Sequence, residues 1–158
     1  MLDWGIKMKI IKFEDKYRDD LIFMILEAKN ALGMVPGLNE DLLDIKKNYF
    51  DKGDMFWVAL DENDRVIGSV GYNSVKGTTN AVLHRLFVKY NLKHRGIGTA
   101  LLTTVERHLI EKGKRNVIVH LGNKEHFFES WKFYPKHGYR EYAPNYMCKT
   151  LQNYEVKL

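Results

Sequence analysis

The spacing of apolar residues changes several times along the chain, between a helical period and strict alternation. In chain order, the pattern predicts a strand over residues 9–13, a helix closing near residue 33, a helix over 39–50, strands over 55–60, 66–72 and 81–88, a helix over 98–112, a strand over 117–121, a helix over 125–133, and strands over 139–142 and 146–150. Most strands are bounded by glycine, asparagine or aspartate, and the two at 55–60 and 66–72 form a hairpin around the turn at 61–64.

The ends of two predicted helices carry recognisable signals. Asp15 or Asp19 is placed to cap the first helix, and Gly33 is placed to end it. The helix that starts at Gly98 has a regular apolar face and stops at Gly113, with a lysine just before the glycine.

The element order β, α, α, β, β, β, α, β, α, β, β indicates a mixed α/β fold, in which helices cover a sheet. No repeat, low-complexity tract or linker divides the chain. We expect residues 1–7 to be a leader before Met8, an alternative start, and residues 8–158 to form a single domain.

Composition narrows the class of protein. The balance of 45% apolar and 28% charged residues is typical of a globular domain. Cys148 is the single cysteine, so no internal disulfide can form. With no signal peptide and no apolar run of about 20 residues, the sequence predicts a cytoplasmic protein that does not cross a membrane. The formal charge of +5 favours anionic partners.

Part of this positive charge is concentrated directly before the helix that starts at Gly98. Lys93, His94 and Arg95 precede Gly96 and Gly98 here. The first turn of a helix has unpaired N–H groups and a positive dipole end, and glycines let a phosphate approach the main chain. The segment therefore predicts a pyrophosphate site. The alternative is that the glycines form only a tight turn and the cations stay in water.

Two other phosphate-binding motifs fit less well. A dinucleotide-binding Gly-x-Gly-x-x-Gly would need a third glycine, but the run continues Thr99-Ala100-Leu101. A Walker loop would need a glycine followed by Lys-Ser or Lys-Thr, which is absent. Nucleic-acid binding would call for a recognition helix or an aromatic stripe among the cations, and neither is present.

The motif at 93–98 resembles that of the GCN5-related N-acetyltransferases (GNAT), whose signature is Arg or Gln, two residues, Gly, one residue, then Gly or Ala. The preceding residues 85–88 and the following residues 100–102 are similar to the family's fourth strand and third helix. Residues 133–139 resemble its late motif of Tyr, three residues, Gly and an aromatic residue. The resemblance extends over almost the whole chain.

The resemblance implies a mostly antiparallel sheet flanked by about four helices and splayed between its fourth and fifth strands, with acetyl-CoA in the gap as co-substrate. It implies that the pantetheine pairs with the main chain of Phe87 and Val88. The pyrophosphate then lies on a loop that comprises Lys93, His94, Arg95, Gly96, Ile97, Gly98, Thr99 and Ala100.

The catalytic groups are less clearly defined. Tyr134 is the family-type acid for the departing thiolate, although a packing role is the competing interpretation. His84 and His120 are the candidate bases, alongside a base acting through water or no dedicated base. Val82 occupies the position where many family members carry a glutamate. We expect no metal site, because the His, Asp and Glu residues lack ligand spacing.

The sequence thus predicts an N-acetyltransferase that moves an acetyl group from acetyl-CoA to a primary amine of a small molecule or peptide. The alternative is a non-catalytic acyl-CoA-binding module of the same fold. The amine and the oligomeric state are left open, with a homodimer as one option.

Overall fold

The structure is a computed structural model that describes residues 7–35, 37 and 39–152. Its strands are β1 (Met8–Lys12), β2 (Phe56–Asp61), β3 (Val66–Ser74), β4 (Asn80–Val88), β5 (Asn116–His120), β6 (Arg140–Ala143) and β7 (Tyr146–Thr150). Its α-helices are α1 (Arg18–Ala31), α2 (Ile45–Asn48), α3 (Ile97–Glu111) and α4 (Phe128–Lys136), with short 3-10 helices η1 (Asp15–Tyr17), η2 (Glu40–Leu43), η3 (Phe50–Lys52) and η4 (Tyr90–Leu92). The predicted element order is confirmed. The predicted leader lies outside the described residues except for Lys7.

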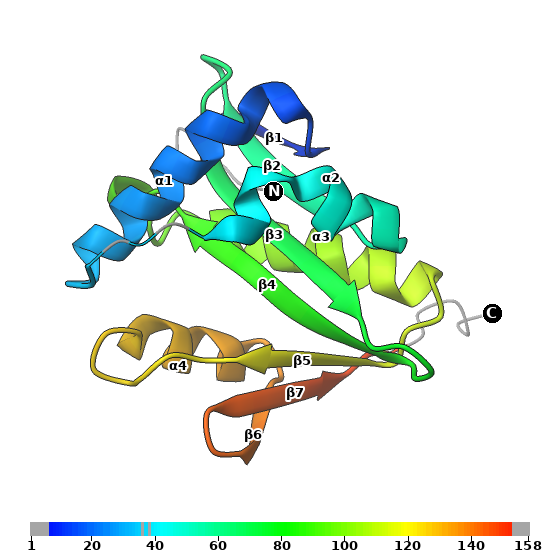
Figure 1. Cartoon of the computed structure of the whole chain (residues 1–158). Helices are drawn as coiled ribbons and strands as arrows, with labels where there is room; N and C mark the ends of the chain where they lie inside the picture. The colour runs from blue at the N-terminus through cyan, green and yellow to red at the C-terminus, as the bar shows by residue number, and fades with distance from the viewer. Residues whose placement is uncertain (1–6, 36, 38, 153–158) are drawn as a thin grey trace.

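The strands form one mixed sheet in the order β1-β2-β3-β4-β5-β7-β6. Neighbouring strands are antiparallel except β4 and β5, which are parallel. That parallel pairing is brief, because it joins only residues 80–82 to residues 116–118. Beyond it the two strands diverge, so the sheet is splayed between β4 and β5 as expected (Figure 1).

Each face of the sheet has its own core, because successive strand residues point to opposite sides. On one face, Leu101, Val105 and Leu109 of α3 and Tyr134 of α4 are buried against the sheet. On the other face, the residues of α1 and α2 cover β1 to β4. Figure 1 shows α1 and α2 over this half of the sheet and away from β5, β6 and β7.

The predicted cap of α1 is wrong. The helix follows η1 directly, and its first turn receives no side-chain cap. Asp19 instead pairs with Arg18 at 3.0 Å. Asp20 accepts hydrogen bonds from the Val66 N–H at 2.8 Å and from Arg65, so a carboxylate of the first turn serves to join α1 to β3.

The single helix predicted over residues 39–50 is broken into η2, α2 and η3. Asp44 interrupts it with an extended φ of −145°, and its carboxylate accepts from the Lys47 N–H at 3.0 Å. The break allows Leu42, Ile45 and Tyr49 all to be buried, at 2% exposure or less. A continuous helical pattern cannot reveal such a break, because tertiary packing decides it.

The last helix begins and ends three residues later than predicted. Asn123 forms a turn first, since its side chain accepts from the His126 N–H at 2.9 Å. At the other end the helix continues through Tyr134 and Pro135 to Lys136. Proline is tolerated there because only one backbone hydrogen bond close to the helix end is lost.

Candidate active site

The gap between β4 and β5 opens where their pairing stops, just after Val82 and Ile118. Residues paired in a parallel ladder point to the same face, and residues two positions further along do so again. His84 and His120 therefore lie on the same face of the sheet, one on each side of the opening. This face is the one that α1 and α2 cover beside β4.

A β-bulge in β4 shapes one side of the gap. The register shifts between Ser69 and Gly71 of β3, where the extra residue of β4 is accommodated at Arg85 with φ of 58°. The Ser69 hydroxyl, which is fully buried, donates to the Arg85 carbonyl at 2.7 Å. A positive φ in a non-glycine residue costs roughly 1 kcal/mol or more, so the surrounding contacts hold this bulge in place.

The bulge is followed by main-chain groups that face the gap. The Lys89 N–H donates to the Ile67 carbonyl at 2.9 Å, and Val88 lies opposite Gly68. Hydrogen-bonded and non-bonded pairs alternate in an antiparallel ladder, so the Val88 pair is a non-bonded one. The N–H and C=O of Val88 consequently point away from β3 and into the gap.

The loop before α3 supplies a second set of main-chain donors. His94 and Gly96 both have positive φ, at 63° and 82°, and the helix begins at Ile97, whose side chain is buried. The N–H groups of the first helical turn have no intrahelical partner. A Cβ at Gly98 would lie 3.5 Å from Phe133 and 3.6 Å from Val88, so a larger side chain would occupy the space between α3, α4 and β4.

The cations of this loop are arranged differently from the expectation. Lys93 and His94 both contact Glu129 of α4, at 2.9 Å each, although the His94 side chain is largely exposed. Mainly through its hydrogen bond from Lys93, the pKa of Glu129 is lowered, so the carboxylate stays ionised. Arg95 is exposed and forms no ion pair within the described part of the chain.

One face of α4 lies against the start of α3. Glu129, Phe133 and His137 follow one another at four-residue intervals, which places them on the same side of the helix. Glu129 contacts Lys93 and His94, Phe133 lies beside Gly98, and His137 is 3.3 Å from the Thr99 hydroxyl. Glu129 is a member of the site that the sequence pattern did not indicate.

Tyr134 is buried, with 5% of its surface exposed, and packs edge-on against Phe133 and Tyr139. Burial raises its pKa, which keeps the hydroxyl protonated. No described residue hydrogen-bonds this hydroxyl, in contrast to that of Tyr139, which donates to Glu106. The tyrosine thus has a packing role and a hydroxyl free to donate.

The two histidines differ in their surroundings. His84 is half-buried beside the Tyr49 ring, and burial, followed by the charge of Arg85, lowers its pKa. His120 is exposed and its ring lies 4.7 Å from that of Tyr146 on β7. A neutral imidazole is the form that accepts a proton, and the His84 environment favours it.

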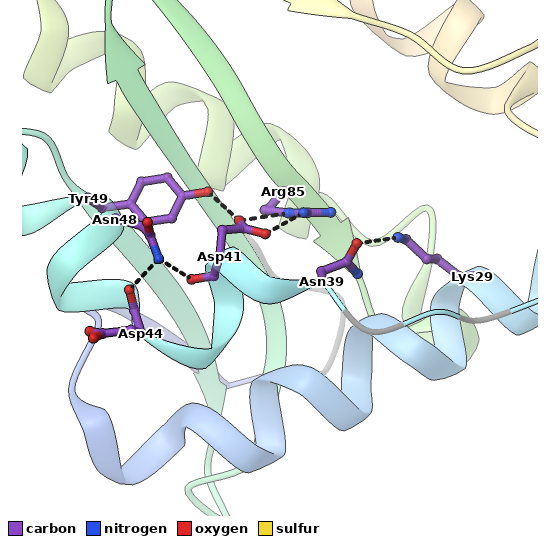
Figure 2. A network of polar contacts seen from close by, with 7 residues as sticks. All are labelled: Lys29, Asn39, Asp41, Asp44, Asn48, Tyr49 and Arg85. Carbon is purple, nitrogen blue, oxygen red and sulfur yellow. Dashed lines mark hydrogen bonds and ion pairs between the residues drawn. The ribbon is translucent and has the colours of Figure 1, made fainter.

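A polar network that the sequence did not predict lies on the same face as His84 (Figure 2). Arg85 of the bulge donates two hydrogen bonds to Asp41 of η2, and the Tyr49 hydroxyl donates to the same carboxylate at 2.8 Å. Lys29 of α1 donates to the Asn39 side chain at 3.3 Å. The one sequence signal was the pair His84-Arg85, two polar residues in succession that break the alternation of β4.

Other candidate features lie elsewhere. Trp57 is buried with Tyr72 and His108 on the α3 face of the sheet. An open hollow of about 540 Å³ lies at the opposite end of α1, near Tyr17, Phe23 and Arg65, and has no contact with the gap residues.

Within residues 7–35, 37 and 39–152, no three metal-ligating side chains come together. None of the helices described is both long and apolar enough to cross a membrane.

Comparison with known proteins agrees with this geometry. The model of the acetyltransferase (GNAT) family matches residues 10–139. The human protein named N-acetyltransferase 8 is 30% identical over 113 residues, which cover 68% of this chain and 48% of that protein. Its namesake from Rattus norvegicus is 34% identical over 90 residues, or 54% of this chain and 40% of that protein. The chain thus spans less than half the length of these relatives.

Solved structures share the fold. A GNAT-family acetyltransferase from Staphylococcus aureus Mu50 superposes with a TM-score of 0.83 at 22% identity, covering 92% of this chain and all of that one. The PaiA N-acetyltransferase of Thermoplasma acidophilum, solved in complex with coenzyme A, has a TM-score of 0.72 at 18% identity, covering 91% of this chain and 99% of that one. From the fold and the match over residues 10–139, we conclude that the chain belongs to the acetyltransferase (GNAT) family.

Proposed function

We propose that this protein transfers an acetyl group from acetyl-CoA to a primary amine of a small molecule or peptide by direct attack in a ternary complex. The observation that carries the proposal is the line of free main-chain groups along one open edge, from Val88 on β4 to the first turn of α3. The family membership and the coenzyme A complex of the Thermoplasma protein support the choice of ligand.

The chain fits this co-substrate in two ways. Gly98 has no side chain to keep a diphosphate away from the start of α3, and the unpaired amides and positive dipole end of this helix favour its charge. The Val88 N–H and C=O pair with the pantetheine arm in the same way that a further strand would pair with β4. Arg95, together with Lys93 and His94 once they leave Glu129, adds positive charge around the phosphates.

In the transfer step, the amine nitrogen forms a bond to the carbonyl carbon while the bond from that carbon to sulfur breaks. The Val88 N–H is the candidate donor to the oxygen that becomes negative. His84 is the better-placed acceptor of the amine proton because its environment keeps it neutral, and His120 lies across the opening. The Tyr134 hydroxyl gives its proton to the departing thiolate.

The test combines binding with turnover. Calorimetry with acetyl-CoA measures binding to the chain, and release of free thiol in the presence of a panel of primary amines measures transfer. Amine-dependent thiol release supports the enzyme. Tight binding of acetyl-CoA without release by any amine would instead identify a non-catalytic acyl-CoA-binding module, and absence of binding would refute both.

A further inference from the structure

The polar network beside the gap has an uneven distribution of charge. Asp41 accepts two hydrogen bonds from Arg85 and one from Tyr49, so its carboxylate is paired and nearly saturated. These contacts lower the pKa of Asp41 although its burial opposes them, which keeps it ionised. The Arg85–Asp41 pair is therefore electrically neutral and offers little capacity to accept a hydrogen bond from an incoming group.

Lys29, by contrast, has no carboxylate in direct contact. It forms no ion pair with any carboxylate of the described residues, whereas Lys89 and Lys93 at the same gap pair with Glu27 and Glu129. Its recorded hydrogen-bond partner is the amide oxygen of Asn39, at 3.3 Å, and an ammonium group has three donors. Burial and the nearby Arg85 lower the pKa of Lys29, and the charge of Asp41 offsets only part of this effect.

Lys29 also lies on the side of α1 that faces the gap. Its ammonium group is 6.0 Å from the centre of the Phe87 ring on β4. Gly33, four residues further along, approaches the opposite side of the gap, since a Cβ there would be 3.7 Å from the His126 ring. In Figure 2, Lys29 extends from α1 toward Asn39, and Arg85 of β4 contacts Asp41.

We propose that Lys29, supported by Arg85, is an anion subsite for the acceptor, so that the amine which this protein acetylates carries a carboxylate. This inference rests on the proposed acetyl transfer and adds the chemical class of the acceptor. A half-buried charge is stable when it is paired, and a substrate carboxylate supplies the missing partner.

The charge of Lys29 also assists the reaction. An amine reacts only in its neutral form, and the positive charge of Lys29 disfavours a second cation beside it. The carboxylate of a free amino acid would bind Lys29 and hold the neighbouring amine over Phe87, toward the bulge. A simple alkyl amine lacks this anchor.

The rest of such an acceptor has an apolar surface available. On the uncovered face of β5 to β7, His120, Tyr146 and Tyr142 form an aromatic strip with ring-to-ring distances of 4.7 and 6.1 Å. Tyr146 is 39% exposed and Tyr142 is 58% exposed. Phenylalanine is therefore the first probe, since it carries both a carboxylate for Lys29 and an aromatic ring of the kind that such a strip accepts.

The experiment compares free amino acids, led by phenylalanine, with the matching amino-acid amides, which lack the carboxylate. For the intact protein and for Lys29→Met, kcat/KM is measured for each member of a pair. Mutation leaves the intrinsic reactivity of each amine unchanged, so the change in the acid-to-amide ratio isolates the contribution of Lys29. We expect this ratio to fall by about tenfold or more in Lys29→Met and to recover in Lys29→Arg.

Lys16→Met is the matched control, since Lys16 also lies over an aromatic ring, 5.2 Å from the centre of Tyr17, but far from the gap. It should leave the ratio unchanged. A ratio in Lys29→Met equal to that of the intact protein, or a ratio that also falls in Lys16→Met, would refute the subsite.

A binding measurement separates this inference from the proposed enzyme. With coenzyme A present, calorimetry compares N-acetylphenylalanine with its amide in the intact protein and in Lys29→Met. Selective binding of the acid that depends on Lys29 supports the subsite even if no amine is turned over, in which case only the proposed enzyme is refuted. Failure of every acid to be preferred in both turnover and binding overturns the subsite.

Discussion

The two sides of the gap are built in different ways. The proposed coenzyme side comes from one continuous stretch, residues 86–100, and offers main-chain groups held in place by a bulge and a helix start. The proposed acceptor side is assembled from side chains distant in sequence, among them Lys29, Asp41, Arg85 and Tyr146. Main-chain recognition depends on backbone shape, whereas the acceptor side depends on which charges are paired. The two sides should therefore respond to mutation in different ways.

The largest effect is expected at Gly98, where stability and binding should change in opposite directions. The Cβ of an aspartate there would have only ordinary contacts with Phe133 and Val88. In the first turn of α3 it should raise the free energy of unfolding by about 1 kcal/mol, from helix propensity and the dipole. Its charge should abolish two or more hydrogen bonds to the diphosphate, a loss of about 4 kcal/mol or roughly 1000-fold in affinity.

Calorimetry with acetyl-CoA and urea unfolding of Gly98→Asp measure both quantities. Gly113→Ala at the far end of α3 is the control, because the positive φ of 78° at this position would strain an alanine although the space around it is open. It should lower stability and leave coenzyme affinity intact. If Gly98→Asp leaves the affinity for acetyl-CoA unchanged, the coenzyme does not bind at the start of α3.

Two buried tyrosines should separate catalysis from stability. The Tyr134 hydroxyl has no hydrogen-bond partner among the described residues, whereas the Tyr139 hydroxyl donates to Glu106 at 2.7 Å. We expect Tyr134→Phe to lower kcat by about 100-fold, as loss of a general acid does, and to change stability by less than about 0.5 kcal/mol. Tyr139→Phe should cost about 2 kcal/mol of stability and leave kcat unchanged.

Steady-state kinetics and thermal unfolding of the two variants provide the measurements. Acetyl-CoA affinity should change little in either. If kcat is the same in Tyr134→Phe as in the unmodified chain, the tyrosine serves only to pack α4 against the sheet.

The difference between the two sides also explains what the sequence could predict. Strand alternation, the helical face of α3 and the glycines at 96 and 98 are local signals, and the elements they predict are present in the structure. The pairing of Arg85 with Asp41 spans 44 residues, and that of Lys93 with Glu129 spans 36, so no local pattern could indicate either. The break at Asp44 and the late start of α4 after Asn123 depend in the same way on packing and on a side-chain turn.

A smaller effect is expected at the two histidines on either side of the opening. The lowered pKa of His84 keeps it neutral as pH falls through about 6.5, the ordinary value for histidine. If His84 takes the amine proton, kcat/KM should hold through that value and decline only at lower pH, where the imidazole becomes charged. His84→Gln should reduce the rate at pH 7 by about tenfold, less than the usual effect of losing a general base, since water can substitute.

The pH profile of kcat/KM for the parent chain, His84→Gln and His120→Gln tests this assignment. Loss of the acid-side decline in His84→Gln alone identifies His84 as the group. If only His120→Gln loses this decline, the exposed His120 beside Tyr146 accepts the amine proton instead.

The smallest effect is expected at Glu129, a side chain distant in sequence that contacts the proposed coenzyme loop. It is a side chain of α4, yet it contacts Lys93 and His94 of the coenzyme loop at 2.9 Å, where a diphosphate would draw on the same donors. Its lowered pKa keeps it charged throughout the neutral range, so it competes with the phosphates. Because all three side chains are partly exposed, at 31%, 79% and 34% for Lys93, His94 and Glu129, water and salt weaken these pairs. Glu129→Gln should therefore tighten acetyl-CoA binding by only about threefold, measured by calorimetry at low salt, with a smaller gain at high salt. Weaker binding in Glu129→Gln would mean that the carboxylate holds Lys93 in the position from which it contacts the coenzyme.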